Sequence, residues 1–96
     1  MQSEGFDFDK AAVILKAIAH PVRLSILQEL AGSESRTVTQ LVNMAGIDQP
    51  LVSHHLAQMR LRGLLWARKQ GKEVHYSLRE IHLREVLQCI GKCSCN

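Results

Sequence analysis

All three cysteines of this 96-residue chain lie in its closing stretch, QCIGKCSCN. Cys89, Cys93 and Cys95 form a C-x3-C-x-C pattern that can bring three sulfurs together at a helix end. His82 and Glu80 stand upstream and can add a nitrogen and an oxygen ligand. Because thiolates prefer soft ions, the pattern predicts a site for a soft metal or metalloid such as zinc, cadmium, lead or arsenite.

Two other interpretations of the thiols stay open. The cysteines could sense oxidants or reactive sulfur by forming a disulfide within or between subunits. Since Cys89 and Cys93 are one helical turn apart, a bond between them would distort the helix. Alternatively, Cys89 is an ordinary buried hydrophobic residue and the end of the chain is frayed. An odd number of cysteines is not typical of a secreted disulfide framework, which favours a cytoplasmic protein with reduced thiols.

A second group of chemically active side chains lies in the middle of the chain. From Gln49 to Lys72 there are five Lys or Arg residues and two His residues, with no Asp or Glu. Such a segment presents a surface of one sign, as phosphate binding requires. A solvated basic helix would have the same composition, so the elements that carry the segment decide between the two interpretations.

Those elements are predicted to be mostly helical. The chain has two Phe, one Tyr and one Trp, and its apolar content comes from aliphatic residues, which favours packed helices. Apolar spacing predicts a helix over 8–19, capped by Asp7 or Asp9, and a second over 21–31 that Pro21 opens. A chain of this length is near the lower limit for a self-sufficient core, so a second copy would add stability.

A helix-turn-helix is predicted over about residues 37–62. Val52, Leu56 and Met59 recur at helical spacing and form the buried stripe of its second helix. Gly46 permits the sharp turn between the two helices. A short helix, a glycine-containing turn and a second helix together are typical of this motif.

The segment of about 64–78 is predicted to be a β hairpin with a basic tip. Apolar and polar residues alternate on either side of the turn QGK, and a last helix follows over about 79–93. A helix-turn-helix followed by a hairpin is a winged helix. The predicted fold is therefore one domain over 1–96, mainly α with a small β hairpin (α+β).

Three segments resemble the ArsR/SmtB family of bacterial winged-helix repressors, in the family's order and spacing. They are LKAIAHPVRLSILQEL, PLVSHHLAQMRLRGLL and ARKQGKEVHYSL. The second and third are similar to the family's Val-Ser-His-x-Leu recognition helix and its Arg-Lys-x-Gly-x-x-x-x-Tyr wing. The resemblance runs from about residue 10 to the end of the chain. It implies a homodimer, joined through its terminal helices, that represses transcription from a palindromic operator until an inducer arrives.

The residues predicted to meet base edges lie on the exposed side of the recognition helix. They are Gln49, Pro50, Leu51, Ser53, His54 and His55. Gln can bond adenine, Ser and His can reach bases or phosphates, and Leu can contact a thymine methyl. Ser53 and His54 stand at the family's motif positions, whereas relatives usually carry Gln in place of His55.

Basic residues at the end of the recognition helix and along the wing are predicted to contact phosphate, with the wing tip entering a minor groove. They are Arg60, Arg62, Arg68, Lys69, Gln70 and Lys72. Arg68 could instead pair with Glu73. No cofactor is required for this binding, and we expect affinity for double-stranded DNA to fall steeply with salt.

The resemblance also implies a ligand set on the last helix. Members with a metal site there use a carboxylate-x-His pair from one subunit and a His with a further ligand from the partner. Glu80 and His82 match the first pair, and Cys93 stands where the partner's His would be. The fourth position falls on Asn96, beside Cys95.

Other protein classes fit the sequence less well. We find no phosphate-binding Gly-rich loop and no Ser-His-Asp or Cys-His arrangement, so an enzyme is not expected. No stretch approaches the roughly 20 apolar residues of a membrane span. A winged helix that docks protein instead of DNA is the remaining alternative, and the acid-free basic segment disfavours it.

Overall fold

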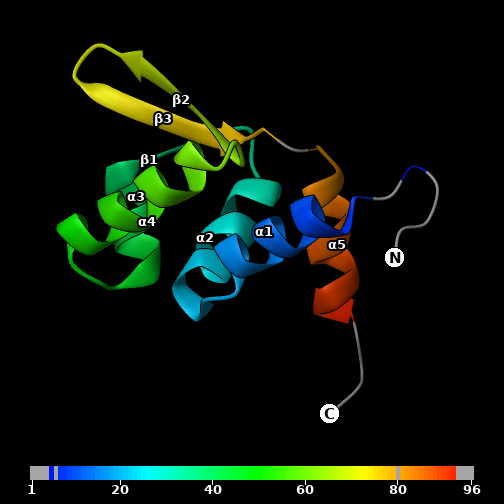
Figure 1. Cartoon of the computed structure of the whole chain (residues 1–96). Helices are drawn as coiled ribbons and strands as arrows, with labels where there is room; N and C mark the ends of the chain where they lie inside the picture. The colour runs from blue at the N-terminus through cyan, green and yellow to red at the C-terminus, as the bar shows by residue number, and fades with distance from the viewer. Residues whose placement is uncertain (1–4, 6, 80, 93–96) are drawn as a thin grey trace.

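The computed structural model describes residues 5, 7–79 and 81–92. Figure 1 shows its elements, which are α1 (Phe8–Ile18), α2 (Pro21–Ala31), β1 (Arg36–Thr37), α3 (Val38–Ala45), α4 (Gln49–Leu61), β2 (Leu65–Gln70), β3 (Glu73–Leu78) and α5 (Ile81–Lys92). The predicted α+β fold, mainly helical with a small hairpin, is confirmed. The hairpin projects past α3 and α4 at one end of the molecule, and α5 stands at the other end.

Side chains cap the first three helices. The Asp7 carboxylate accepts a hydrogen bond from the Lys10 backbone N–H at 3.0 Å, so of the two predicted caps, Asp7 and Asp9, it is Asp7 that caps α1. His20 caps α2 in the same way through its Nδ1 atom. At α3, the Thr37 hydroxyl accepts from the Gln40 N–H and the Gln40 side chain accepts from the Thr37 N–H, which forms a capping box. These bonds determine where the helices begin.

The end of α4 is tied directly to the start of the hairpin. Gly63 takes a left-handed conformation with φ of 78°, which its missing Cβ permits. Its N–H donates to the Arg60 carbonyl at 2.9 Å, and the Leu64 N–H donates to the Met59 carbonyl at 3.0 Å. This pair of bonds is a Schellman motif. It turns the chain from the helix into β2 without an intervening loop.

The hairpin belongs to a three-stranded antiparallel sheet in the order β1-β3-β2. Its turn has two residues, since Gln70 pairs with Glu73, and Gly71 has φ of 63°. Glycine at the first turn position with positive φ is typical of a type II′ hairpin turn. The two-residue β1 was not predicted, because its pairing with Tyr76 and His75 is long-range and leaves no pattern in so short a segment.

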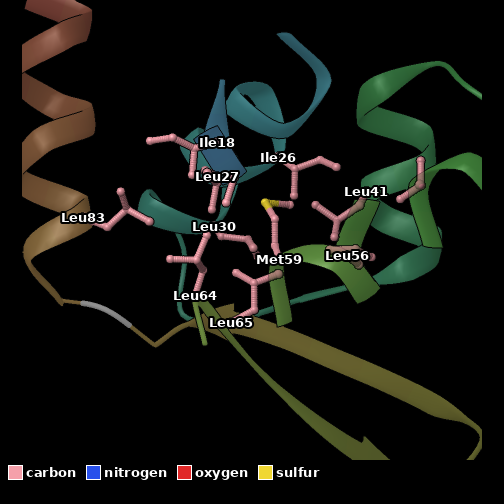
Figure 2. Close-up of a cluster of buried hydrophobic side chains, with 12 residues drawn as sticks. Ile18, Ile26, Leu27, Leu30, Leu41, Leu56, Met59, Leu64, Leu65 and Leu83 are labelled. Atoms are coloured by element: carbon pink, nitrogen blue, oxygen red, sulfur yellow. The ribbon is translucent and has the colours of Figure 1, made fainter. Parts of the chain in front are cut away.

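One hydrophobic core joins the helix-turn-helix, the hairpin and α5. Its members are Ala17, Ile18, Ile26, Leu27, Leu30, Leu41, Val52, Leu56, Met59, Leu64, Leu65 and Leu83. Figure 2 shows Met59 in the middle of this cluster and Leu83 pointing into it from α5. The predicted buried stripe of α4 is confirmed, since Val52, Leu56 and Met59 are each 0% exposed. Residues of α4 and α5 therefore belong to the same core.

Within the described residues, no single helix has the length and apolar character needed to span a membrane. The pair α1 and α2 meets those two criteria only when taken together, and the two helices are bent by 98° at the break between them.

Candidate nucleic-acid interface

The outward face of α4 is polar at the start of the helix. Gln49, Pro50 and His54 are exposed, and Ser53 is half-buried. Leu51 is an apolar side chain that is 46% exposed. Gln49, Ser53 and His54 lie outside the buried stripe, as the sequence predicted, and their contacts with DNA stay a prediction. Side chains of these types can meet base edges in a major groove.

His55 does not lie on this face. Its side chain is 5% exposed, and its Nδ1 atom accepts a hydrogen bond of 3.0 Å from Arg23 Nε. The prediction that His55 lies on the exposed side is therefore wrong. The spacing contained the signal, because residue 55 is three positions after Val52 and four before Met59, at the edge of the buried stripe. We remove His55 from the candidate interface.

The basic side chains continue the same surface onto the hairpin. Arg60, Arg62, Arg68, Lys69, Gln70 and Lys72 are all exposed. Among the described residues, the ion pair found is that of Arg36 with Glu29 at 2.8 Å, so the proposed Arg68–Glu73 pair does not form. The positive groups of α4 and the wing are therefore available to an external anion.

Arg79 and Trp66 form a contact that the sequence did not predict. The Arg79 guanidinium lies 4.4 Å from the centroid of the Trp66 ring, within cation–π range, and Trp66 is 55% exposed. Trp66 also lines a groove of about 660 Å³ on the sheet, together with Arg68 and His75. A lone Trp at an outward strand position was the available sequence signal.

The last helix divides into an inner and an outer face. Leu83 is 4% exposed and Leu87 packs against the core, whereas Val86 and Ile90 are 43% and 55% exposed. Cys89 is an exposed free thiol, so its interpretation as a buried residue is wrong for the single subunit. Apolar side chains are also exposed on α1, namely Phe8, Val13 and Leu15. The two terminal helices thus carry apolar surface that the described part of the chain does not cover.

Comparisons with known proteins identify the family of this chain. Residues 20–65 fit the profile described as bacterial regulatory protein, arsR family. The transcriptional repressor PagR of Bacillus anthracis is 32% identical over 88 residues, which cover 92% of this chain and 88% of PagR. The regulator YgaV of Escherichia coli K12 is 31% identical, with coverage of 91% and 88%. The chain belongs to the ArsR family.

Solved structures of ArsR-type regulators agree with the fold. HlyU from Vibrio cholerae N16961 superposes with a TM-score of 0.84 at 30% identity, over 100% of both chains.

The repressor SmtB of Mycobacterium tuberculosis is 38% identical over 79 residues, but this chain spans only 58% of SmtB's length.

The candidate inducer ligands of this ArsR-family chain are only partly described. Glu80, Cys93 and Cys95 lie outside the described residues. His82 and Cys89 are both exposed on α5, seven positions apart and therefore on one side of the helix. In the described part of the chain, no three His, Cys, Asp or Glu side chains converge on a common metal position.

Proposed function

We propose that this ArsR-family chain is a homodimeric DNA-binding repressor whose α4 enters the major groove. The observation that carries the proposal is the division of α4 into a fully buried stripe and an exposed polar start, within a segment that has no acidic residue. A helix that is held on one face and polar on the other can be pressed against a duplex without losing its core packing.

Specificity is assigned to the start of α4. Gln49 can bond adenine through its amide, Ser53 and His54 can reach base edges, and Leu51 with Pro50 can contact a thymine methyl. In a two-fold dimer, two copies of α4 would read half-sites about one helical turn apart, roughly 34 Å.

Affinity is assigned to the basic side chains that follow. Arg60 and Arg62 lie at the end of α4, and Arg68, Lys69 and Lys72 lie on the wing, all exposed. Each neutralised phosphate releases counterions, so binding should weaken steeply with salt. Gln70 adds a hydrogen-bond donor near the wing tip, where the chain could enter a minor groove.

Dimerisation is assigned to α1 and α5. Apolar side chains exposed on both helices, such as Val13, Leu15 and Ile90, would be covered by a second copy. A small domain with uncovered aliphatic side chains gains stability by that burial. It also places the outer side of α5, with its thiol, near the dimer axis.

We propose a soft metal or metalloid as the inducer, held by Cys93 and Cys95 with Cys89, His82 and Glu80 as further ligands. The donor set fits, because sulfur and imidazole suit zinc, cadmium, lead or arsenite. A relative supports it: a probable mercury resistance operon repressor of Streptomyces lividans is 35% identical over 85 residues. Binding across the dimer would stabilise one arrangement of the two α4 helices over another.

Thiol redox sensing is the second candidate. The Cys89 thiol is exposed in the single subunit, and two copies of it near the dimer axis could form a disulfide between subunits on oxidation. A structure titled reduced HlyU from Vibrio cholerae N16961 is 32% identical, with a TM-score of 0.83 over 92% of both chains. Vibrio cholerae HlyU is named a transcriptional activator, so the promoter-reporter experiment below distinguishes repression from activation.

The function is tested by selecting duplexes from a random double-stranded pool with the reduced protein, followed by sedimentation with the selected duplex. We expect a palindromic consensus bound by a dimer, and promoter-reporter repression that depends on Ser53 and His54. A protein that is monomeric at micromolar concentration, or that enriches no duplex, would contradict the proposal.

The inducer is tested on the same complex. Zinc, cadmium, lead and arsenite are added separately, and peroxide or polysulfide in parallel. We expect a soft ion to release DNA from the wild type and not from Cys93→Ser. Release by oxidants alone would favour the redox candidate, and induction that survives serine at all three cysteines would exclude both.

A further inference from the structure

Arg23 of α2 connects the end of α1 to the recognition helix. Its Nη1 atom donates to the Ala17 carbonyl at 2.9 Å, in the last turn of α1, and its Nε atom donates to His55 Nδ1 at 3.0 Å. A guanidinium has a rigid planar fork of donors, so the two bonds fix the relative positions of their acceptors. One side chain thus links three helices.

His55 lies in a small cluster of rings at this junction. The centroid of its ring is 4.6 Å from that of His20 and 5.8 Å from that of His54. His55 is only 5% exposed, so little water reaches the ring. Because Nδ1 accepts a hydrogen bond, the ring must be neutral with its proton on Nε2.

We propose that Arg23 and His55 are positioning residues that hold α4 in its reading orientation, and that protonation of the His55 ring releases α4. The consequence for DNA rests on the proposed function, whereas the consequence for α4 does not. An imidazolium carries N–H groups on both nitrogens and cannot accept from Arg23. Protonation would replace the 3.0 Å hydrogen bond with two facing donors and two like charges.

The surroundings of the ring favour the neutral form. Burial lowers the pKa of His55 below its ordinary value of 6.5, and the positive charges of His20, Arg23 and His54 lower it further. The pKa of His55 in the folded protein lies below that of the unfolded chain. The stability that neutral His55 contributes is therefore fully present above about pH 6.5. It is lost as the pH falls from there through the folded-state pKa.

The neighbouring His54 provides a control for this effect. His54 is exposed at the proposed DNA face and is not part of the hydrogen bond between Arg23 and His55. Protonation of His55 should weaken specific binding, because α4 loses its link to Arg23. The two histidines are adjacent in sequence, but the Arg23 hydrogen bond is made to His55.

The test uses the full chain and four variants. His55→Asn keeps an acceptor near the Nδ1 position and cannot be protonated, and His55→Gln is a second acceptor if Asn folds poorly. Arg23→Met removes both donors and keeps the apolar stem. His54→Asn is the matched control, since it removes the exposed ring next door.

Two measurements are made at about pH 7.5 and over a series of lower pH values, because the pKa of His55 lies below the ordinary value of 6.5, at constant ionic strength. Hydrogen exchange of the α4 amides needs no DNA. The ratio of affinities for the selected duplex and a scrambled duplex measures the sequence specificity of DNA binding. In the wild type, we expect α4 protection to fall at the lower pH values and the ratio to drop about tenfold, the effect of one hydrogen bond to a charged group.

The variants separate the outcomes. His55→Asn should keep both quantities constant with pH. Arg23→Met should behave at pH 7.5 as the wild type does at the lowest pH. His54→Asn should retain the fall in α4 protection, the readout that needs no DNA. If the acceptor variants show the same fall as the wild type, or if Arg23→Met leaves α4 exchange unchanged, the inference is wrong. If no duplex is selected at any pH, the proposed function fails, and α4 exchange still decides the role of the pair.

Discussion

The recognition helix α4 and the terminal helix α5 are of similar length but differ in what holds them. On α4, Val52, Leu56 and Met59 are fully buried within the subunit. On α5, Leu83 reaches the core, while Val86 and Ile90 remain exposed. The apolar stripe of α4 is covered by the subunit's own core, whereas α5 keeps an apolar face that the described residues do not cover. This difference supports the proposal that α4 reads DNA and that α5 associates with a second subunit.

The largest effect expected is on the core of α4. Leu56→Ala removes a side chain that is 0% exposed and should lower the free energy of unfolding by about 2–5 kcal/mol. Urea denaturation measures it. The matched variant Leu61→Ala, on the same helix but 79% exposed, should change stability by less than about 0.5 kcal/mol. Equal losses in the two variants would contradict the division of α4 into two faces.

The next effect is on association through α5. Val86→Glu places a charge on the proposed dimer face and should weaken dimerisation by about 3 kcal/mol, because that charge would be buried without a partner. Gln88→Glu adds the same charge at an exposed polar position and should leave the dimer intact. Sedimentation equilibrium measures both dissociation constants. A dimer that tolerates Glu at position 86 would place the interface elsewhere.

A smaller effect is expected at the tip of the wing. Lys72→Gln should reduce the slope of log affinity against log salt by about 2, one phosphate contact for each subunit, and lower affinity roughly tenfold. Fluorescence anisotropy with the selected duplex measures it over a salt series. Arg84→Gln removes one exposed charge from α5 and should leave the slope unchanged. A common change in both variants would mean that only net charge matters.

The smallest effect is on the start of α3. Thr37→Ala breaks the capping box and should cost about 1 kcal/mol of unfolding free energy. Thr39 is exposed two residues later, and Thr39→Ala should have almost no effect in the same denaturation experiment. Indistinguishable variants would show that α3 is held by Leu41 and its core contacts alone.

The sequence was informative where local rules dominate. The cap of α1, the glycine turn at Gly46 and the buried stripe of α4 follow from residue types and helical spacing, and each is found as predicted. The exposed start of α4 was predicted for the same reason, because the stripe determines its opposite side. The order of the elements also followed from the residues, and the family resemblance that agreed with this order is confirmed by the comparisons.

Contacts between distant segments were not predictable in this way. Arg23 and His55 are 32 positions apart, and nothing in either segment identifies the other as its partner. The pairing of β1 with β3 has the same character. The periodicity of α5 predicted an association face, but a single sequence does not distinguish cover by another segment from cover by another subunit. Cys89 illustrates this, since the same position is exposed here and would be enclosed in a dimer.

The Schellman end of α4 sets a mechanical condition on any duplex the protein reads. Since Leu64 is bonded back to Met59 and β2 starts at the next residue, no joint separates the helix from the hairpin. A base pair inserted between half-sites rotates one half against the other by about 34° and lengthens the site by about 3.4 Å. In the proposed dimer, helix and hairpin would follow that rotation together, so a change in half-site spacing would have to be accommodated at the boundary between the subunits.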